Sequence, residues 1–232
     1  MSRPDPSLVS VIIPAHNAER FLRSTLASAQ KQSYANMEII VVDDGSTDST
    51  AAIAMAVAAA DKRVRIIRQK NSGVAAARNR AIAESRGDFI APLDADDIWH
   101  SDNVALQVAA LKAAGPDTAV SYAWFVTIDE RGRFRAIANH YKHREKRKVL
   151  VRQIEGNFIG NASSSVIRRD AVLAVGGYDE SYRARNAEGC EDQALYIALA
   201  ERWDFAVVPQ FLIAYRVHPN SMTQDGVRME PP

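Results

Sequence analysis

The chain has few of the features that mark a specialised class of protein. Cys190 is the only cysteine among 232 residues. A single cysteine excludes both a disulfide framework and a cysteine-rich zinc site. No apolar run approaches the roughly 18 residues that suggest a membrane span. The first ten residues, MSRPDPSLVS, contain no apolar segment of the kind found in signal peptides. These observations predict a cytoplasmic protein.

An excess of charge of either sign is also lacking. Lysine and arginine together number 29, aspartate and glutamate number 28, and the net charge is +1. A balanced chain has no overall field that would attract nucleic acid, so we expect no nucleic-acid partner and only local charged sites. The composition, 47% hydrophobic and 25% charged, is that of an ordinary globular domain.

What the chain does contain is a regular alternation of short apolar runs with helix-like segments. The apolar runs predict strands at 9–13 (ended by Pro14), 37–42, 64–68, 88–93 and 118–126, and the segments between them predict helices at 19–31, 49–60, 73–85 and 102–113. Strands that are apolar on both faces indicate an α/β fold with a mostly parallel sheet and helices on both faces. Ligands bind beyond the carboxyl ends of such strands. The loops after the first four strands should therefore lie along one rim.

The alternation stops after residue 127. A short strand near Val166, a helix at 192–202 and strands at 205–208 and 211–216 are predicted in the second half. We predict one domain over 1–232, with a nucleotide-binding half at about 8–100, an acceptor and catalytic half at 101–218, and a mobile tail at 219–232. Charge-dense composition without apolar periodicity makes 140–153 and 219–232 the segments expected to be least ordered.

Acidic residues follow two of the predicted strands. Asp94, Asp96 and Asp97 come directly after the run 88–93. Alternate carboxylates can direct oxygens at one hard cation, but aspartate is also favoured at helix starts. The pair Asp43-Asp44 allows two readings as well: contacts to a base or ribose, or turn and cap chemistry.

Three other positions have two interpretations each. Glu191-Asp192 are either ordinary first-turn acids or include a general base. His218 follows the last predicted strand and is either a surface group or a neutral imidazole ligand at the rim. Arg78 either faces phosphate or pairs with an acid.

Six segments, in this order, resemble those of the family 2 glycosyltransferases, which have the GT-A fold. They are VSVIIPAHNAERFL, IIVVDDGSTDST, NSGVAAARNRAI, GDFIAPLDADDIW, VGGYDE and CEDQAL, with YRVH a weaker match. The resemblance spans about residues 8–218. Each motif alone is unspecific, but six in register form a specific pattern. The resemblance implies a Rossmann-like GT-A fold with a smaller acceptor-side subregion.

The resemblance also implies an activity. It is the metal-dependent, inverting transfer of a sugar from a nucleotide-sugar, by preference a UDP-sugar, to a hydroxyl of a glycan or glycolipid in surface polysaccharide synthesis. Asp192, beside Glu191, matches the catalytic base. Asp96 would be the direct ligand of Mg²⁺ or Mn²⁺, with Asp94 in the same DxD motif and His218 completing the site. The nucleotide would contact Pro14, Ala15, His16, Asn17, Asp43, Asp44, Asn71, Gly73, Arg78, Asp94 and Ala95.

The sequence departs from the family pattern at two places. The family usually has an aromatic residue where His16 stands, so a base would stack on imidazole here. An aromatic is also common after the Glu-Asp pair, but this chain has Gln193-Ala194. The second departure changes the shape expected for the acceptor pocket.

Two other classes of function remain open. A nucleotidyltransferase would also use a metal and a nucleotide at this rim, but PAHNAERF lacks the expected Gly/Arg/Lys-rich phosphate loop. A sugar-nucleotide-binding module without activity is disfavoured because Asp94, Asp96 and Asp192 are intact. The basic stretch 142–152 either rests on anionic lipid at the inner face of a membrane or is a solvated loop.

Overall fold

The computed structural model describes residues 7–137, 149–219 and 221. Its strands are β1 (Val9–Ala15), β2 (Met37–Asp44), β3 (Val64–Gln69), β4 (Phe89–Pro92), β5 (Ile98–Trp99), β6 (Thr118–Ile128), β7 (Phe134–Ile137), β8 (Ser165–Arg168) and β9 (Asp204–Arg216). Its α-helices are α1 (Leu22–Gln30), α2 (Thr50–Ala60), α3 (Val74–Glu84), α4 (Asn103–Ala114), α5 (Leu150–Glu155), α6 (Arg169–Ala174), α7 (Ser181–Ala184) and α8 (Glu191–Ala200), and η2 (Ala162–Ser164) is a 3-10 helix.

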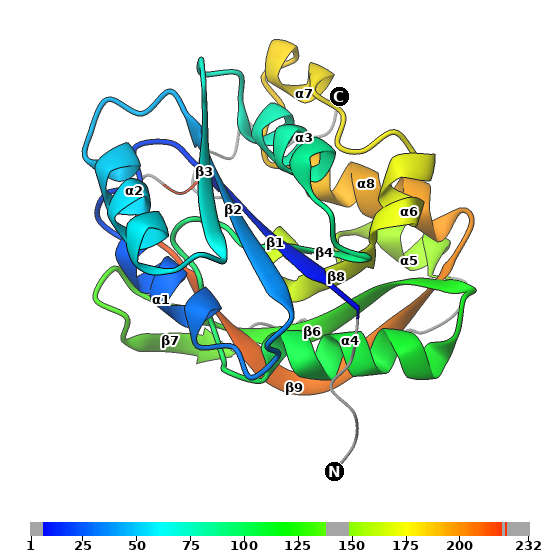
Figure 1. Ribbon diagram of the computed structural model, residues 1–232. Helices are drawn as coiled ribbons and strands as arrows, with labels where there is room; N and C mark the ends of the chain where they lie inside the picture. The colour runs from blue at the N-terminus through cyan, green and yellow to red at the C-terminus, as the bar shows by residue number, and fades with distance from the viewer. Residues whose placement is uncertain (1–6, 138–148, 220, 222–232) are drawn as a thin grey trace.

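These strands form one nine-stranded sheet (Figure 1). Its order is β3-β2-β1-β4-β8-β6-β9-β5, and β7 pairs with β6. Strands β1 to β4 are parallel, as predicted for the first half. Beyond β4 the sheet is mixed, because β8 runs antiparallel to both β4 and β6 while β6 and β9 are parallel. The predicted α/β fold is confirmed, and its second half contributes the antiparallel pairs.

Helices cover both faces of the sheet, which explains the continuously apolar strands. Successive side chains of a strand point to opposite faces. In β1, Val11 and Ile13 pack into a core with α1, α2 and α4, while Ile12 packs into a second core with α3, α6 and α8. All three side chains are fully buried. Because both faces of such a strand are buried, its side chains are apolar at every position and do not alternate with polar ones.

Two strand predictions were wrong in detail. Pro14 does not end the first strand, because β1 continues to Ala15. The Ile12 carbonyl faces β4, where it accepts from Leu93 N, and β4 pairs no further than Ile12. The nitrogen of Pro14 points to the same side as the Ile12 carbonyl, toward β4. No strand pairs with β1 there beyond Ile12, so the missing N–H of proline costs the sheet no hydrogen bond. The strands predicted at 205–208 and 211–216 are one strand, β9, whose register shifts at Pro209-Gln210, since a bulge accommodates proline.

Several short elements had no clear signal in the sequence. They include β5, β7, α5, α6 and α7, which have six residues or fewer. Residues 142–148 of the basic stretch and all but two residues of the predicted tail lie outside the described part of the chain. Residues 149–152, at the end of the basic stretch, are described and include the first turn of α5.

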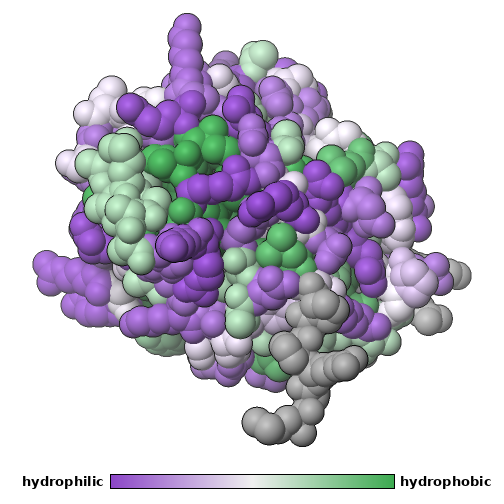
Figure 2. Space-filling model, viewed as in Figure 1, coloured by the Kyte–Doolittle hydropathy of each residue, from purple (hydrophilic) through white to green (hydrophobic). Residues whose placement is uncertain are grey.

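Figure 2 shows a face that is mainly hydrophilic, with apolar areas separated by polar side chains. Among residues 7–137 and 149–219, no helix combines the length and the apolar content needed to cross a bilayer.

Candidate active site

The loops that follow β1, β2 and β3 are tied together at one rim, as predicted. Both carboxylate oxygens of Asp44 accept bonds from the loop after β3: Oδ1 from Ser72 N and Oδ2 from Gly73 N, each at 2.8 Å. Gly73 has a φ of +94°, and a Cβ there would lie 2.6 Å from the carboxylate of Glu188. Asp44 is buried, so its first task is to fix the Asn71–Gly73 loop. Asp43, also buried, accepts from Ser46 N and from Arg68.

His16 stands at the opening of this rim. Its Nδ1 lies 2.9 Å from the Asp44 carbonyl oxygen, and its ring nitrogens lie 3.1 Å from the Asn71 amide nitrogen. Asn17, at a φ of +48°, accepts from Thr47 N through Oδ1. The imidazole is exposed, and its contacts with Asp44 and Asn71 hold it in place. A flat ring fixed beside the β2 and β3 loops can serve as a stacking surface.

Arg78 does not face the open rim. Its side chain is 2% exposed, and it donates to Asp94 Oδ1 and to Glu191 Oε1, each at 2.7 Å. Of the two interpretations of the sequence, the pairing with acids is the one found. Asp94 is thereby directed toward Arg78, and its backbone N–H is held by Ser163 Oγ at 3.0 Å. The guanidinium links the loop after β4 to the start of α8.

Asp192 lies next to this buried ion pair. It is 8% exposed, its Oδ2 accepts from the Asn157 amide at 3.2 Å, and its Oδ1 accepts from Gln193 N. Burial, and then the nearby Glu191 carboxylate, raise the pKa of Asp192 to about 7. A carboxyl group with this pKa can accept and release a proton near neutral pH. The burial and the hydrogen bonds of Asp192 suit a general base, whereas an acid that only stabilises the first turn of a helix needs neither.

Asp96 and His218 meet although 122 positions separate them in sequence. His218 Nε2 lies 3.0 Å from Asp96 Oδ2, and the His218 ring packs on Phe21 with 5.0 Å between the centroids. A carboxylate oxygen beside an imidazole nitrogen fits a divalent metal. Within the described residues no third carboxylate, imidazole or thiol joins them, so the remaining ligands would come from a diphosphate and water. Asp94, the other predicted ligand, is engaged by Arg78.

Asp97, the third carboxylate of the acidic cluster, is fully buried. Its Oδ2 accepts from Ser163 Oγ at 2.6 Å, and its Oδ1 accepts from the backbone N–H of Arg216 at 2.9 Å. The backbone oxygens of Asp97 and of Ala95 both accept from Thr25 Oγ1. Asp97 therefore fastens the rim loop to β9 and η2, and it caps no helix, because α4 is capped at Asp102.

Sequence reasoning missed two residues of this site. Arg216 is buried, and its Nε donates to the Asp96 carbonyl at 2.8 Å. Asn157 contacts Asp192 from the loop after α5. The weak YRVH match contains Arg216 and could have drawn attention to it, whereas no periodicity or motif marked Asn157.

The predicted nucleotide and metal positions thus share one rim, and the buried Asp192 follows Glu191, the partner of Arg78. Pro14 and Ala15 end the strand that leads to His16, and Ala15 is buried. The sequence predicted this gathering from strand order. Which atoms are free and which are already bonded is visible only in the structure.

Comparison with known proteins agrees with this arrangement. The family model described as glycosyl transferase family 2 matches residues 10–176. A putative glycosyltransferase, EpsH of Bacillus subtilis, is 31% identical over 223 residues, which cover 93% of this chain and 62% of EpsH. The Escherichia coli UDP-Glc:alpha-D-GlcNAc-diphosphoundecaprenol beta-1,3-glucosyltransferase WfgD is 38% identical over 108 residues, 46% of this chain and 42% of WfgD.

Among solved structures, S. aureus TarS 1-349 in complex with UDP-GlcNAc aligns with a TM-score of 0.75 and 20% identity, over 93% of this chain and 60% of TarS. This likeness establishes the fold. The chain spans less than two thirds of the length of EpsH, WfgD or this TarS chain. With a family model that matches most of its length and a GT-A-type sheet that carries the motifs on one rim, the chain belongs to glycosyl transferase family 2.

Proposed function

We propose that this protein transfers a sugar from a nucleotide-sugar, by preference a UDP-sugar, to a hydroxyl of a glycan or glycolipid acceptor with inversion at the anomeric carbon. The observation that carries the proposal is a buried carboxyl group with a pKa of about 7, Asp192, next to Glu191, whose partner Arg78 also binds Asp94 of the DxD loop. The UDP-GlcNAc complex of TarS and the UDP-Glc donor named for WfgD support the choice of donor.

The nucleotide would occupy the first half of the rim. His16 offers an exposed ring for the base, and the Asn71–Gly73 loop, fixed by Asp44, closes one side. Asp96 and His218 would hold Mg²⁺ or Mn²⁺, and such an ion would offset the negative charge of the departing nucleoside diphosphate. An imidazole ligand suits Mn²⁺ better than Mg²⁺, which prefers oxygen.

Asp192 would take the proton from the acceptor hydroxyl as that oxygen attacks the anomeric carbon. The hydroxyl is a weak nucleophile until its proton has an acceptor. Asn157 and the Gln193 N–H hold the carboxylate in one orientation. Attack from the face opposite the leaving group gives inversion in a single displacement, and no covalent enzyme intermediate forms.

The acceptor named for WfgD is linked to a lipid diphosphate. A similar acceptor would bring this protein to the inner face of a membrane. The basic stretch 142–152 is the part of the sequence suited to contact anionic lipid there.

A thermal-shift screen tests the donor class. UDP and UDP-sugars should raise the melting temperature, and more so with Mn²⁺ present, because a ligand that binds only the folded state stabilises it. Stronger stabilisation by UTP than by any UDP-sugar would favour a nucleotidyltransferase instead. If no nucleotide changes the melting temperature, the proposed function is wrong.

A further inference from the structure

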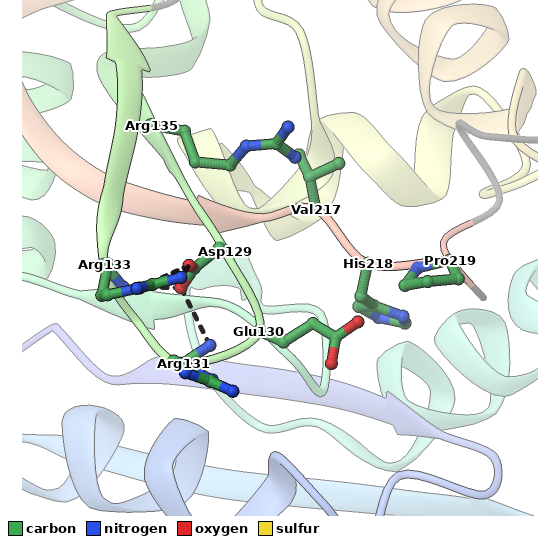
Figure 3. A pocket seen from close by; sticks show the side chains of 8 residues that line it. All are labelled: Asp129, Glu130, Arg131, Arg133, Arg135, Val217, His218 and Pro219. Carbon is green, nitrogen blue, oxygen red and sulfur yellow. Dashed lines mark hydrogen bonds and ion pairs between the residues drawn. The ribbon is translucent and has the colours of Figure 1, made fainter.

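A cavity of about 640 Å³ opens beside His218. Two segments line it: residues 129–135, which lead from β6 into β7, and residues 217–219, which follow β9 (Figure 3). In the sheet order, β3, β2 and β1 lie on one side of β4, whereas β6 and β9 lie on the other. The cavity is therefore at the β6–β9 part of the sheet, next to the Asp96–His218 pair, and Arg20 of the loop after β1 reaches its edge through Glu130.

The cavity is rich in arginine, and the two acids that line it are already paired. Asp129 accepts from the Arg133 side chain at 2.7 Å and from the backbone N–H of Arg131 and of Arg133. These bonds lower the pKa of Asp129 to about 2, so it stays ionised and bound to Arg133. Glu130 forms an ion pair with Arg20.

Two guanidinium groups remain. Arg131 and Arg135 are exposed, and neither side chain forms an ion pair or hydrogen bond with the residues that the structure describes. Figure 3 shows Arg135 extending across the opening toward Val217, while Arg133 turns back to Asp129. The cavity thus keeps two positive charges with no partner among the residues that the structure describes.

The turn that carries these arginines is fixed relative to the candidate active site. The buried Arg216 donates through Nη1 to the carbonyl oxygens of Asp129 and Glu130, at 3.0 and 3.3 Å, and through Nε to the Asp96 carbonyl. One side chain therefore joins the start of the arginine turn to the DxD loop. Groups held in this way are preorganised, so less entropy is lost when a ligand binds.

We propose that Arg131 and Arg135 form a subsite for a phosphate or diphosphate group of the acceptor. Guanidinium groups bind phosphate oxygens with paired, charge-assisted hydrogen bonds. The cavity is large enough for such a group together with an attached sugar, and it ends at His218, beside the proposed point of transfer. The assignment to the acceptor rests on the proposed glycosyl transfer, whereas the anion site itself rests on the arginines alone.

Titration calorimetry with inorganic pyrophosphate in metal-free buffer tests the anion site without any turnover. Wild type should bind pyrophosphate, and Arg131→Gln/Arg135→Gln should bind it roughly 10- to 100-fold more weakly. Arg80→Gln/Arg202→Gln removes the same charge from α3 and from the end of α8, and it should bind pyrophosphate as wild type does. All four substituted positions are exposed, and an unchanged melting temperature will show that each variant is folded. Equal affinity in wild type and in Arg131→Gln/Arg135→Gln would overturn the site, as would an equal loss in the control.

A second titration, with UDP and Mn²⁺, distinguishes the source of the phosphate. An acceptor subsite predicts that Arg131→Gln/Arg135→Gln binds UDP with wild-type affinity. If UDP binding weakened as much as pyrophosphate binding, the arginines would contact the donor diphosphate, and the acceptor assignment would be wrong. Absence of UDP binding by wild type would contradict the proposed function instead, and the anion site would then stand on the pyrophosphate result.

Discussion

Arg78 donates to Glu191 across 2.7 Å, and neither side chain is more than 3% exposed. The two residues come from α3 and from the first position of α8, 113 positions apart. A charge at this depth is tolerated because its partner lies beside it. With the bond from Arg78 to Asp94, the pair joins α3, the loop after β4 and the start of α8.

Arg78→Met should strongly destabilise the protein. It leaves Glu191 and Asp94 facing each other without their cation, and breaking a buried pair in this way typically costs about 3–5 kcal/mol. Urea denaturation measures the loss. Arg80→Gln is the matched control on the same helix, since its pair with Glu84 is exposed and should contribute less than about 0.5 kcal/mol. Similar losses in the two variants would show that the buried pair has no special structural role.

Asp192→Asn should keep the shape of the site and remove its proton acceptor. We expect kcat to fall by about 10²- to 10⁴-fold, the usual contribution of a general base. Donor Kd should stay near the wild-type value because, within the described part of the chain, Asp192 accepts hydrogen bonds from Asn157 and Gln193, and not from the loops that bear His16, Asp44 and Asn71. An early-melting variant with wild-type kcat would mean that Asp192 serves only the start of α8.

The rate should depend on pH through Asp192. Its pKa is raised to about 7 by burial and by Glu191, so transfer should be half-maximal near pH 7 and fall about tenfold per unit well below it. The profile of kcat in single turnovers checks this expectation. A rate that stays constant from pH 5 to pH 8 would contradict the assignment of the base.

The same raised pKa makes a prediction about stability. The folded protein holds a proton on Asp192 at pH values where the unfolded chain, with a pKa near 3.9, has released it. Stability relative to Asp192→Asn should therefore be highest below about pH 4 and should decrease as the pH rises toward 7. Parallel urea titrations of the two proteins across this range measure the difference, and a difference that grows with pH would have the wrong sign.

Asp96→Ala and His218→Ala should each weaken the binding of UDP in the presence of Mn²⁺ and change it little without metal. Each variant removes one of the two side chains proposed to hold the ion. Asp102→Ala and His100→Ala are matched controls, because these two residues form a similar but exposed His–Asp pair. Equal affinity in Asp96→Ala and wild type with Mn²⁺ present would refute the metal assignment.

The sequence by itself determined the first half of the fold. In β1, Val11, Ile12 and Ile13 are apolar without interruption, and only a strand with a core on each face requires that pattern. Parallel strands then bring His16, Asp44, Asn71 and the acidic cluster to one rim, which the strand order alone predicts. Such inferences succeed because each depends on a few consecutive residues and on a general rule of sheet topology.

The tertiary structure decided what each rim residue does. The sequence left Arg78 open between phosphate and an acid, and in the structure it pairs with Glu191, 113 positions away. The same holds for Asp97, which is fixed by Ser163 and Arg216 at separations of 66 and 119 positions. Asn157 carried no signal because its contact with Asp192 depends on where α5 packs. A carboxylate's role is set by the donors that reach it and by its burial, and both are products of long-range packing.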